Sequence, residues 1–204
     1  MIAVIDYGAG NLHSVANALV RLGYQPLVTN NPGKILDAAA VILPGVGAAG
    51  DAMDSLRGFA LIEVVRRIIR EERPFFAVCV GMQILLSATE EGGWQECLGI
   101  IPGTAKRLPS GLKVPHMGWN QVKQQMRHPI FEGIPDEANF YFVHSYYPDL
   151  EDDSVVAGTT QYGLCFCSIL IRGNLVATQF HPEKSGELGL RMYANFLKNA
   201  GVEA

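Results

Sequence analysis

The feature that most limits how this chain can fold is the alternation of short apolar runs with longer amphipathic segments in its first half. Segments of helical periodicity predict helices over about residues 11–22, 56–72 and 82–89. Apolar runs of strand length lie at 2–6, 26–29, 39–45 and 75–80. Short apolar strands that alternate with helices favour an α/β fold, with a mostly parallel central sheet and helices on both of its faces.

The second half of the chain changes to a pattern of successive strands. Strand-like runs lie at 113–115, 121–123, 139–145, 154–159, 164–171 and 174–180, and a helix is predicted over about 186–199. We therefore expect antiparallel hairpins beside the parallel core. No repeat, low-complexity segment or linker divides the 204 residues. Because 49% hydrophobic residues are enough for a full core, we expect a single domain over residues 1–204.

The charge balance argues against a protein that binds nucleic acid or an anionic membrane. The formal net charge is −4, and the 16 lysines and arginines are scattered along the chain, whereas such surfaces need a concentrated basic face. The N-terminal "MIAVIDYGAG" lacks the basic start of a signal peptide, and nowhere do about 18 apolar residues run together. We expect a soluble, cytoplasmic protein with no nucleic-acid or membrane partner.

Four cysteines in a chain of this size do not form a disulfide framework, and no C-x-x-C pair suggests a zinc site. Cys165 and Cys167 lie two apart on a strand and therefore face the same side, where we expect small core residues. Cys97 is expected in the core as well. The interpretation requires no metal and no cofactor.

Four motifs each follow a predicted strand. They are "DYGAGN" (6–11), "PGVGAAGD" (44–51), "CVGMQ" (79–83) and "QFHPEKSG" (179–186). In open α/β sheets, the loops at the carboxyl ends of the strands gather along one crevice where ligands bind. These four loops should therefore converge. Taken alone, "GAGN" indicates a tight turn into a helix rather than a dinucleotide loop, because G-x-G-x-x-G fails at His13. "PGVG" alone could be a simple strand-end turn.

Cys79 lies where a buried strand is expected to turn into a helix. The stretch "AVCVGMQ" resembles a nucleophile elbow, in which a sharp turn holds the nucleophile in a strained conformation at a helix N-terminus. The helix dipole and the free N–H groups there lower the pKa of a thiol and can bind an anion. The alternative is a buried structural cysteine.

His181 and Glu183 lie two apart in "FHPEKS". On an extended segment, whose backbone Pro182 fixes, their side chains leave the same face. A nucleophilic cysteine needs a base, and the base needs a group that orients it. The alternative is a surface histidine beside an exposed glutamate. The combination of Cys79, His181 and Glu183 at strand ends favours a catalytic triad over both alternatives.

"PGVG", "CVGMQ" and "QFHPEKSG", in this order and spacing, resemble the class I (triad) glutamine amidotransferases, a family with a flavodoxin-like fold. Several synthases share these motifs, including those of guanylate and anthranilate. "DYGAGNLHSV", "PHMGWN" (115–120) and "YFVHSYY" (141–147) are similar to one branch, the glutaminase subunits of imidazole glycerol phosphate synthase. One departure is Ala77, because the family commonly has glycine two residues before the nucleophile. We interpret the extra methyl group as tolerated.

The resemblance implies hydrolysis of L-glutamine to glutamate and ammonia. Cys79 attacks the side-chain amide, His181 moves the protons and Glu183 orients the imidazole. The tetrahedral oxyanion needs preorganised donors, and we expect them in the backbone N–H groups of Val46, Gly47 and Val80. By resemblance, the glutamine is held by Gln83, Glu91, His144, Ser145 and Tyr146.

The resemblance also implies a partner, because in this branch the ammonia passes to a (β/α)8-barrel cyclase in a heterodimer. The cyclase forms imidazole glycerol phosphate and an aminoimidazole carboxamide ribotide in L-histidine biosynthesis. Positions that match the family suggest an interface at Asn11, Trp119, Asn120, Tyr141 and Lys184. For Trp119, the alternative is a core aromatic residue.

Two other hypotheses remain open. The chain could be a stand-alone hydrolase, such as a peptidase of the same fold, or a non-catalytic binding subunit that kept the motifs. A hydrolase would release ammonia at full rate alone, and an inert module would not react with glutamine analogues.

Overall fold

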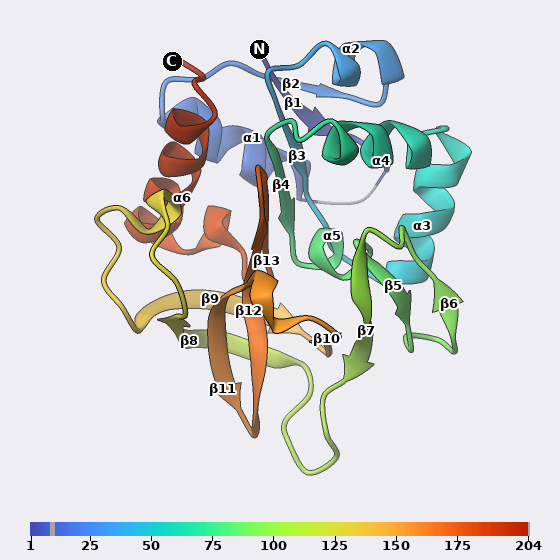
Figure 1. Cartoon of the computed structure of the whole chain (residues 1–204), viewed down its shortest axis with the longest axis vertical. Helices are drawn as coiled ribbons and strands as arrows, with labels where there is room; N and C mark the ends of the chain where they lie inside the picture. The colour runs from blue at the N-terminus through green and yellow to red at the C-terminus, as the bar shows by residue number, and fades with distance from the viewer. Residues whose placement is uncertain (9–10, 204) are drawn as a thin grey trace.

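A mixed sheet runs through the computed structural model, which describes residues 1–8 and 11–203 (Figure 1). Its strands pair in the order β2-β1-β3-β4-β13-β12-β11-β8-β9. The parallel part consists of β2 (Pro26–Thr29), β1 (Ile2–Ile5), β3 (Ala40–Leu43), β4 (Phe75–Val78) and β13 (Leu175–Thr178). The antiparallel part consists of β12 (Leu164–Arg172), β11 (Val156–Tyr162), β8 (His116–Gln124) and β9 (Ala138–His144).

Helices cover the parallel strands on both faces (Figure 1). On one face lie α1 (Leu12–Arg21) and α6 (Gly186–Asn199), which pack against each other. On the other lie α3 (Ala49–Gly58) and α4 (Ile62–Arg70), and the short α2 (Pro32–Leu36) contacts α4. The predicted α/β fold, with a parallel core and antiparallel strands contributed by the second half, is confirmed.

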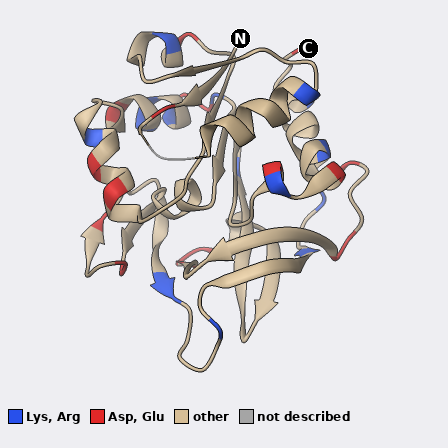
Figure 2. Ribbon diagram, turned by 180° about the vertical axis from the view of Figure 1, so that it is seen from behind, with Lys and Arg blue, Asp and Glu red and all other residues tan. Residues whose placement is uncertain are grey.

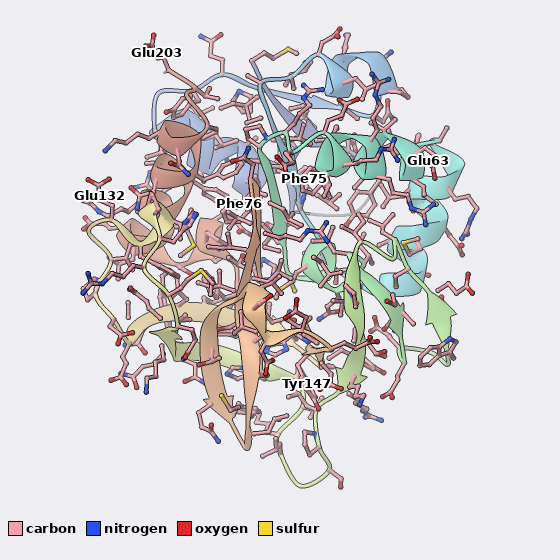
Figure 3. The ribbon with its side chains drawn as sticks, viewed as in Figure 1. Glu63, Phe75, Phe76, Glu132, Tyr147 and Glu203 are labelled. Carbon is pink, nitrogen blue, oxygen red and sulfur yellow. The ribbon has the colours of Figure 1, made fainter. Side chains whose placement is uncertain are left out.

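The core forms where the parallel strands are sandwiched between these helices. Every residue of β1, β3, β4 and β13 is buried, as expected for strands that are covered on both faces. Phe75 and Phe76 of β4 lie in the middle of the molecule (Figure 3). The Phe76 ring lies 5.1 Å from the ring of Tyr193 and 5.2 Å from that of Phe196, both in α6. Each fully buried phenylalanine contributes about 1.5–3 kcal/mol of burial free energy, so this cluster holds α6 to the sheet.

Two helix predictions were wrong. The helix expected over 56–72 is two helices, α3 and α4, because the chain turns at Ala60, whose φ of 56° no α-helix accommodates. The helix expected over 82–89 ends at Gln83, since α5 spans only Val80–Gln83 and residues Leu86–Thr89 form strand β5. A short apolar run fits a buried strand as well as a helix, and pairing with a strand distant in the sequence decides between them here.

That pairing builds a smaller sheet, which the sequence pattern did not indicate. Its strands lie in the order β10-β7-β5-β6, namely β10 (Tyr146–Leu150), β7 (Ile101–Arg107), β5 and β6 (Gln95–Glu96). Other strand predictions were partly right. The run at 121–123 is part of the longer β8, and the run at 154–159 begins with a 3-10 turn, η2 (Asp153–Val155). The run at 113–115 is not a strand.

Charged residues are interspersed over the helices, whereas the antiparallel strands carry few of them (Figure 2). Strands β9 and β11 contain no charged residue, and β8 contains only Lys123. No helix in residues 1–8 and 11–203 is long and apolar enough to cross a membrane.

Two glycines allow the loop after β3 to approach the turn after β4. A Cβ atom on Gly81 would lie 2.6 Å from the carbonyl oxygen of Leu43. A Cβ atom on Gly45 would lie 2.7 Å from the carbonyl oxygen of Val78 and closer still to the backbone nitrogen of Gly81. All of these neighbours are backbone atoms, which cannot move aside as a flexible side chain can.

We therefore expect Gly45→Ala and Gly81→Ala each to lower the free energy of unfolding by about 1–3 kcal/mol, the usual cost of overpacking. The matched control is Gly58→Ala, because a Cβ atom on that helical glycine meets no atom within 4 Å. It should leave the stability unchanged or raise it by up to about 1 kcal/mol. Urea unfolding measures all three, and equal effects at the three positions would contradict the packing argument.

Candidate active site

Cys79 occupies a sharp corner between strand β4 and helix α5. Its backbone has φ 53° and ψ −110°, a conformation that non-glycine residues rarely adopt. Its N–H donates to the carbonyl oxygen of Thr178 on β13 at 2.7 Å, and its carbonyl accepts from the N–H of Met82 at 2.9 Å. The side chain is 3% exposed. The chain therefore has the strained strand-to-helix corner that the sequence predicted.

Ala77 fits this corner without a clash. It pairs with Leu43 of β3 on one side and with Ala177 of β13 on the other. A Cβ atom on Gly81 would lie 2.6 Å from the carbonyl oxygen of Leu43 but 3.6 Å from the methyl group of Ala77. That distance is ordinary van der Waals contact, so the crowding at the elbow arises from the backbone of β3 and not from Ala77.

His181 and Glu183 form a buried pair. His181 Nδ1 lies 2.8 Å from Glu183 Oε1, and both side chains are 1% exposed. An extended segment was expected here, but Pro182–Lys184 forms a 3-10 turn, η3. The turn still brings the carboxylate back to the imidazole, so the expected contact forms by a different backbone route.

Two further side chains donate to the Glu183 carboxylate. Asn11 Nδ2 donates to Oε1 at 2.6 Å, and the Tyr193 hydroxyl donates to Oε2 at 3.4 Å. Asn11 was expected at a partner interface, and here it contacts the acidic member of the candidate triad. Tyr193 was not singled out from the sequence, because an aromatic residue on the apolar side of a helix indicates core packing. Burial, followed by the nearby Glu183, raises the pKa of Tyr193 well above its usual value.

The environment of His181 favours the imidazolium. Burial alone lowers the pKa of His181, but the interactions with Cys79 and Glu183 outweigh it and raise the pKa to about 9. Nδ1 of the ring is directed to Glu183. The other ring nitrogen, Nε2, is buried and has no hydrogen-bond partner among the described residues. The ring is therefore oriented from one side and has a free nitrogen on the other, as a general acid and base requires.

Cys79 and His181 open into a cavity of about 360 Å³. Its lining contains all of the residues that the sequence analysis assigned to the oxyanion and to glutamine: Val46, Gly47, Val80, Gln83, Glu91, His144, Ser145 and Tyr146. Pro115, Val143 and Lys184 complete the lining. The loops after β3, β4 and β13 thus converge at this cavity, as predicted. Of the fourth motif, "DYGAGN", residues 9–10 lie outside the described residues.

Hydrogen bonds hold the polar lining of this cavity in place. The N–H of Ala49, at the start of α3, donates to Glu91 Oε2 at 2.7 Å. Gln83 Nε2 donates to the carbonyl of Tyr146 at 2.9 Å and to Gln179 Oε1 at 3.0 Å. Gln179 Nε2 in turn lies 3.6 Å from Cys79 Sγ. Gln179 was not predicted as a site residue, since its position in "QFHPEKSG" does not by itself indicate a contact with the thiol.

The residues predicted at a partner interface lie in several environments. Trp119 is 58% exposed, which excludes a core role, and its neighbour Met117 is 60% exposed. The Trp119 ring lies 6.0 Å from that of Tyr141. The backbone carbonyl of Tyr141 accepts from the N–H of His181 at 3.0 Å. Lys184 is exposed and lines the cavity, so it reaches both the solvent and the candidate site.

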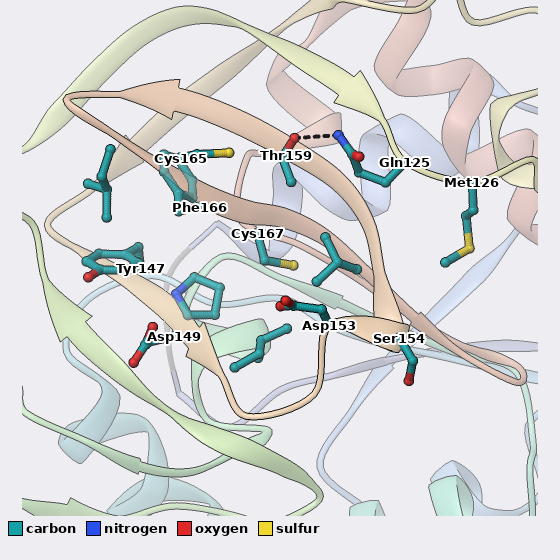
Figure 4. Close-up of a pocket in the computed structure, with 14 residues that line it drawn as sticks. Gln125, Met126, Tyr147, Asp149, Asp153, Ser154, Thr159, Cys165, Phe166 and Cys167 are labelled. Atoms are coloured by element: carbon teal, nitrogen blue, oxygen red, sulfur yellow. Dashed lines mark hydrogen bonds between the residues drawn. The ribbon is translucent and has the colours of Figure 1, made fainter.

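A second cavity, of about 600 Å³, lies beside β10, β11 and β12 (Figure 4). Cys165 and Cys167 both line it, but the described residues around it include no histidine. Burial raises the pKa of Cys167 far above its usual value, and burial likewise raises the pKa of Cys97 to about 11. Cys97 and Cys167 are buried as expected, whereas Cys165 is exposed, contrary to the core prediction. This cavity is larger than the first, and its lining includes the carboxylates Asp149 and Asp153, but neither of its thiols has the buried imidazole–carboxylate pair that lies beside Cys79.

Known proteins resemble this chain over nearly its whole length. The family model "Glutamine amidotransferase class-I" matches residues 3–200. A protein of Dehalococcoides mccartyi named imidazole glycerol phosphate synthase subunit HisH is 56% identical over 200 residues, 98% of each chain. A protein of Chloroflexus aurantiacus with the same name is 52% identical, over 97% of this chain and 95% of the relative. A crystal structure of a glutamine amidotransferase has the same fold, with a TM-score of 0.75, 21% identity, and 99% and 100% of the two chains covered.

We expect Glu183→Gln to lower the pKa of His181, because a neutral amide no longer stabilises the imidazolium. In an NMR titration, the wild-type imidazolium should lose its proton as the pH rises through about 9, and the variant should lose it at lower pH. Glu187→Gln, an exposed carboxylate in the first turn of α6, is the control and should leave the titration unchanged. Equal titration of His181 in wild type and Glu183→Gln would contradict the pair.

Proposed function

Since the chain belongs to the class-I glutamine amidotransferase family, we propose that it hydrolyses L-glutamine as the glutaminase subunit of an imidazole glycerol phosphate synthase. The observation that carries this function is the cavity in which the strained Cys79 meets the buried His181–Glu183 pair. The relatives named for this subunit match over nearly the whole chain at 46–56% identity, which supports the specific branch of the family.

In the proposed reaction, the Cys79 thiolate attacks the carbonyl carbon of the glutamine side chain. The tetrahedral intermediate collapses when His181 gives a proton to the leaving nitrogen, which releases ammonia and leaves a γ-glutamyl thioester on Cys79. Water then attacks the thioester while His181 takes one of its protons, and glutamate leaves as the thiolate and imidazolium re-form. The raised pKa of His181 keeps the proton available until the nitrogen departs.

We assign the oxyanion to backbone donors at the start of α5 and in the loop after β3. The N–H of Val80 lies directly after the nucleophile, and Val46 and Gly47 line the same cavity. Gly47 has φ 88°, a conformation that glycine adopts without strain, so the peptide there can be oriented toward the substrate. Fixed donors of this kind stabilise charge that develops only in the transition state.

We assign the amino-acid end of glutamine to the polar rim of the cavity. Glu91 supplies a carboxylate that can pair with the α-ammonium group, and its position is fixed by the N–H of Ala49. Gln83 and the segment from His144 to Tyr146 supply further polar groups in the same lining. These assignments rest on the geometry of the cavity and on the family pattern together.

We further propose that the ammonia passes to a (β/α)8-barrel cyclase in a heterodimer. The exposed apolar side chains of Met117 and Trp119 on the charge-poor strand β8 support a contact surface there. Lys184 lies between the cavity and the solvent and would stand beside the exit for ammonia. All four cysteines are free thiols, which fits the predicted cytoplasmic location, since that compartment is reducing.

Cys79→Ala in the complex with the cyclase tests the function directly. Removal of the nucleophile should reduce glutamine-dependent synthesis by at least about 10³-fold, because no thioester can form. Synthesis from ammonium salt at alkaline pH should continue, since the cyclase needs only ammonia. Cys165→Ala, at an exposed thiol outside the site, is the control and should retain both activities. Glutamine-dependent synthesis near the wild-type rate in Cys79→Ala would defeat the assignment.

The partner proposal predicts coupling between the two subunits. If the oxyanion donors around Gly47 are misaligned in the free chain, glutamine hydrolysis should rise by about 10²-fold or more in the complex with cyclase and its nucleotide ligand, the effect of one oxyanion donor. Steady-state glutaminase assays with and without the cyclase measure this. Equal turnover in the two states would support a stand-alone hydrolase instead.

A further inference from the structure

A chain of hydrogen bonds leads from the surface strand β8 to the glutamine cavity. Asn120 Nδ2 lies 3.2 Å from His116 Nε2, and His116 Nδ1 lies 2.9 Å from His144 Nε2. His144 Nδ1 then lies 2.8 Å from the carbonyl oxygen of Tyr146. His116 is not among the residues that line the cavity, and no role was expected for it from the sequence.

The end points of this chain determine which nitrogen of each ring carries a proton. The carbonyl of Tyr146 can only accept, so His144 Nδ1 must donate. The neutral His144 ring then has a bare Nε2, which accepts a proton donated by His116 Nδ1. His116 Nε2 is therefore bare as well and accepts from the amide of Asn120. Both histidines are thus the Nδ1–H tautomer, and every bond points toward the cavity.

The orientation of the Asn120 amide supports this direction independently. Its oxygen accepts from the N–H of Gln121 at 2.8 Å, and its nitrogen donates to the carbonyl of Gln161 at 3.0 Å. A flipped amide would lose both bonds, so the nitrogen must face His116. His116 is 4% exposed, and its ring stacks on Tyr162 at 3.9 Å and on Phe142 at 4.9 Å.

Both rings are neutral at physiological pH, as a one-directional chain requires. Burial lowers the pKa of His116 to about 4. Burial also lowers the pKa of His144, to about 3, although the bond to the carbonyl of Tyr146 opposes the shift. An extra proton on either ring would place two donors against each other.

We propose that His116 and His144 are positioning residues of the glutamine site, which set the place of the Tyr146 carbonyl from strand β8. This inference rests on the proposed function. The carbonyl of Tyr146 is shared with Gln83 Nε2, and Gln83 bonds to Gln179, whose amide lies against Cys79 Sγ. A shift of this carbonyl therefore displaces the Gln83 side chain in the cavity and the donor beside the nucleophile.

The tautomers can be observed directly by ¹⁵N NMR of the histidine rings in the wild-type chain. Both His116 and His144 should be protonated at Nδ1, and they should remain so from about pH 6 to pH 8. The Nε2–H tautomer on either ring would overturn the proposal, because the series of hydrogen bonds could not then end on the Tyr146 carbonyl.

Replacement of His116 tests its effect on glutamine. In a Cys79→Ala background, where glutamine is not consumed, His116→Phe should weaken glutamine binding by about tenfold, as expected for the loss of a well-placed hydrogen bond. Phenylalanine keeps the stacking on Tyr162 and Phe142 but removes the donor to His144 Nε2, so the His144 ring loses the bond that holds it against the Tyr146 carbonyl. The side-chain amide introduced by His116→Gln has an acceptor and a donor about as far apart as the two ring nitrogens of histidine. This variant should bind glutamine with an affinity within about twofold of that of the Cys79→Ala parent.

Isothermal titration with L-glutamine measures these affinities, with Gln121→Ala, an exposed residue of β8, as the control that should bind as the parent does. Parent-like binding by His116→Phe, or equal loss in His116→Phe and His116→Gln, would overturn the positioning role. If the parent Cys79→Ala chain binds no glutamine at all, the proposed function fails, and the inference fails with it. Should His116→Phe not fold, His116→Gln and the wild-type tautomers still decide the question.

Discussion

The close approach of three adjacent strand ends fixes Cys79, and the rest of the site is arranged around that corner. The N–H of Cys79 is bonded to Thr178 at the end of β13, while Gly45, after β3, lies against the backbone on either side of Cys79. A non-glycine residue at positive φ costs about 1–3 kcal/mol and persists only where its surroundings over-determine it. Parallel strands in register supply those surroundings, so the parallel core is what makes a strained nucleophile possible in this chain.

The base is held by the other part of the sheet and by both ends of the chain. The N–H of His181 is bonded to the carbonyl of Tyr141 on the antiparallel strand β9. The Glu183 carboxylate receives bonds from Asn11, just before α1, and from Tyr193 in α6. Because α1 and α6 pack together on one face of the sheet, the orientation of the imidazole depends on that packing. The strain at Cys79 and the orientation of His181 therefore have separate structural supports.

The sequence predicted those parts of the fold and the site that depend on local pattern. The parallel strands, α1 and α6 follow from apolar periodicity, and Cys79, His181 and Glu183 follow from strand-end motifs together with the family resemblance. Residues 86–89 were predicted to be helical but form a strand. Their apolar run fits a helix or a strand, and pairing with β7 decides between the two. Gln179, Tyr193 and His116 were missed for the same reason, since each acts through a partner distant in the sequence. The 3-10 turn at Pro182 shows that a predicted contact can form through a backbone route that the pattern did not indicate.

Histidines in one small region have opposite charge preferences, and their partners explain the difference. Burial disfavours the charged form of His181 and His144 alike. His181 faces a carboxylate and a thiol, which together overcome burial, whereas His144 faces a carbonyl and a second neutral ring. The charge on His181 further disfavours a charge on His144. The imidazolium is thus confined to His181, where a proton must be transferred. The His144 ring stays neutral and keeps the single donor and single acceptor that a directional series of hydrogen bonds needs.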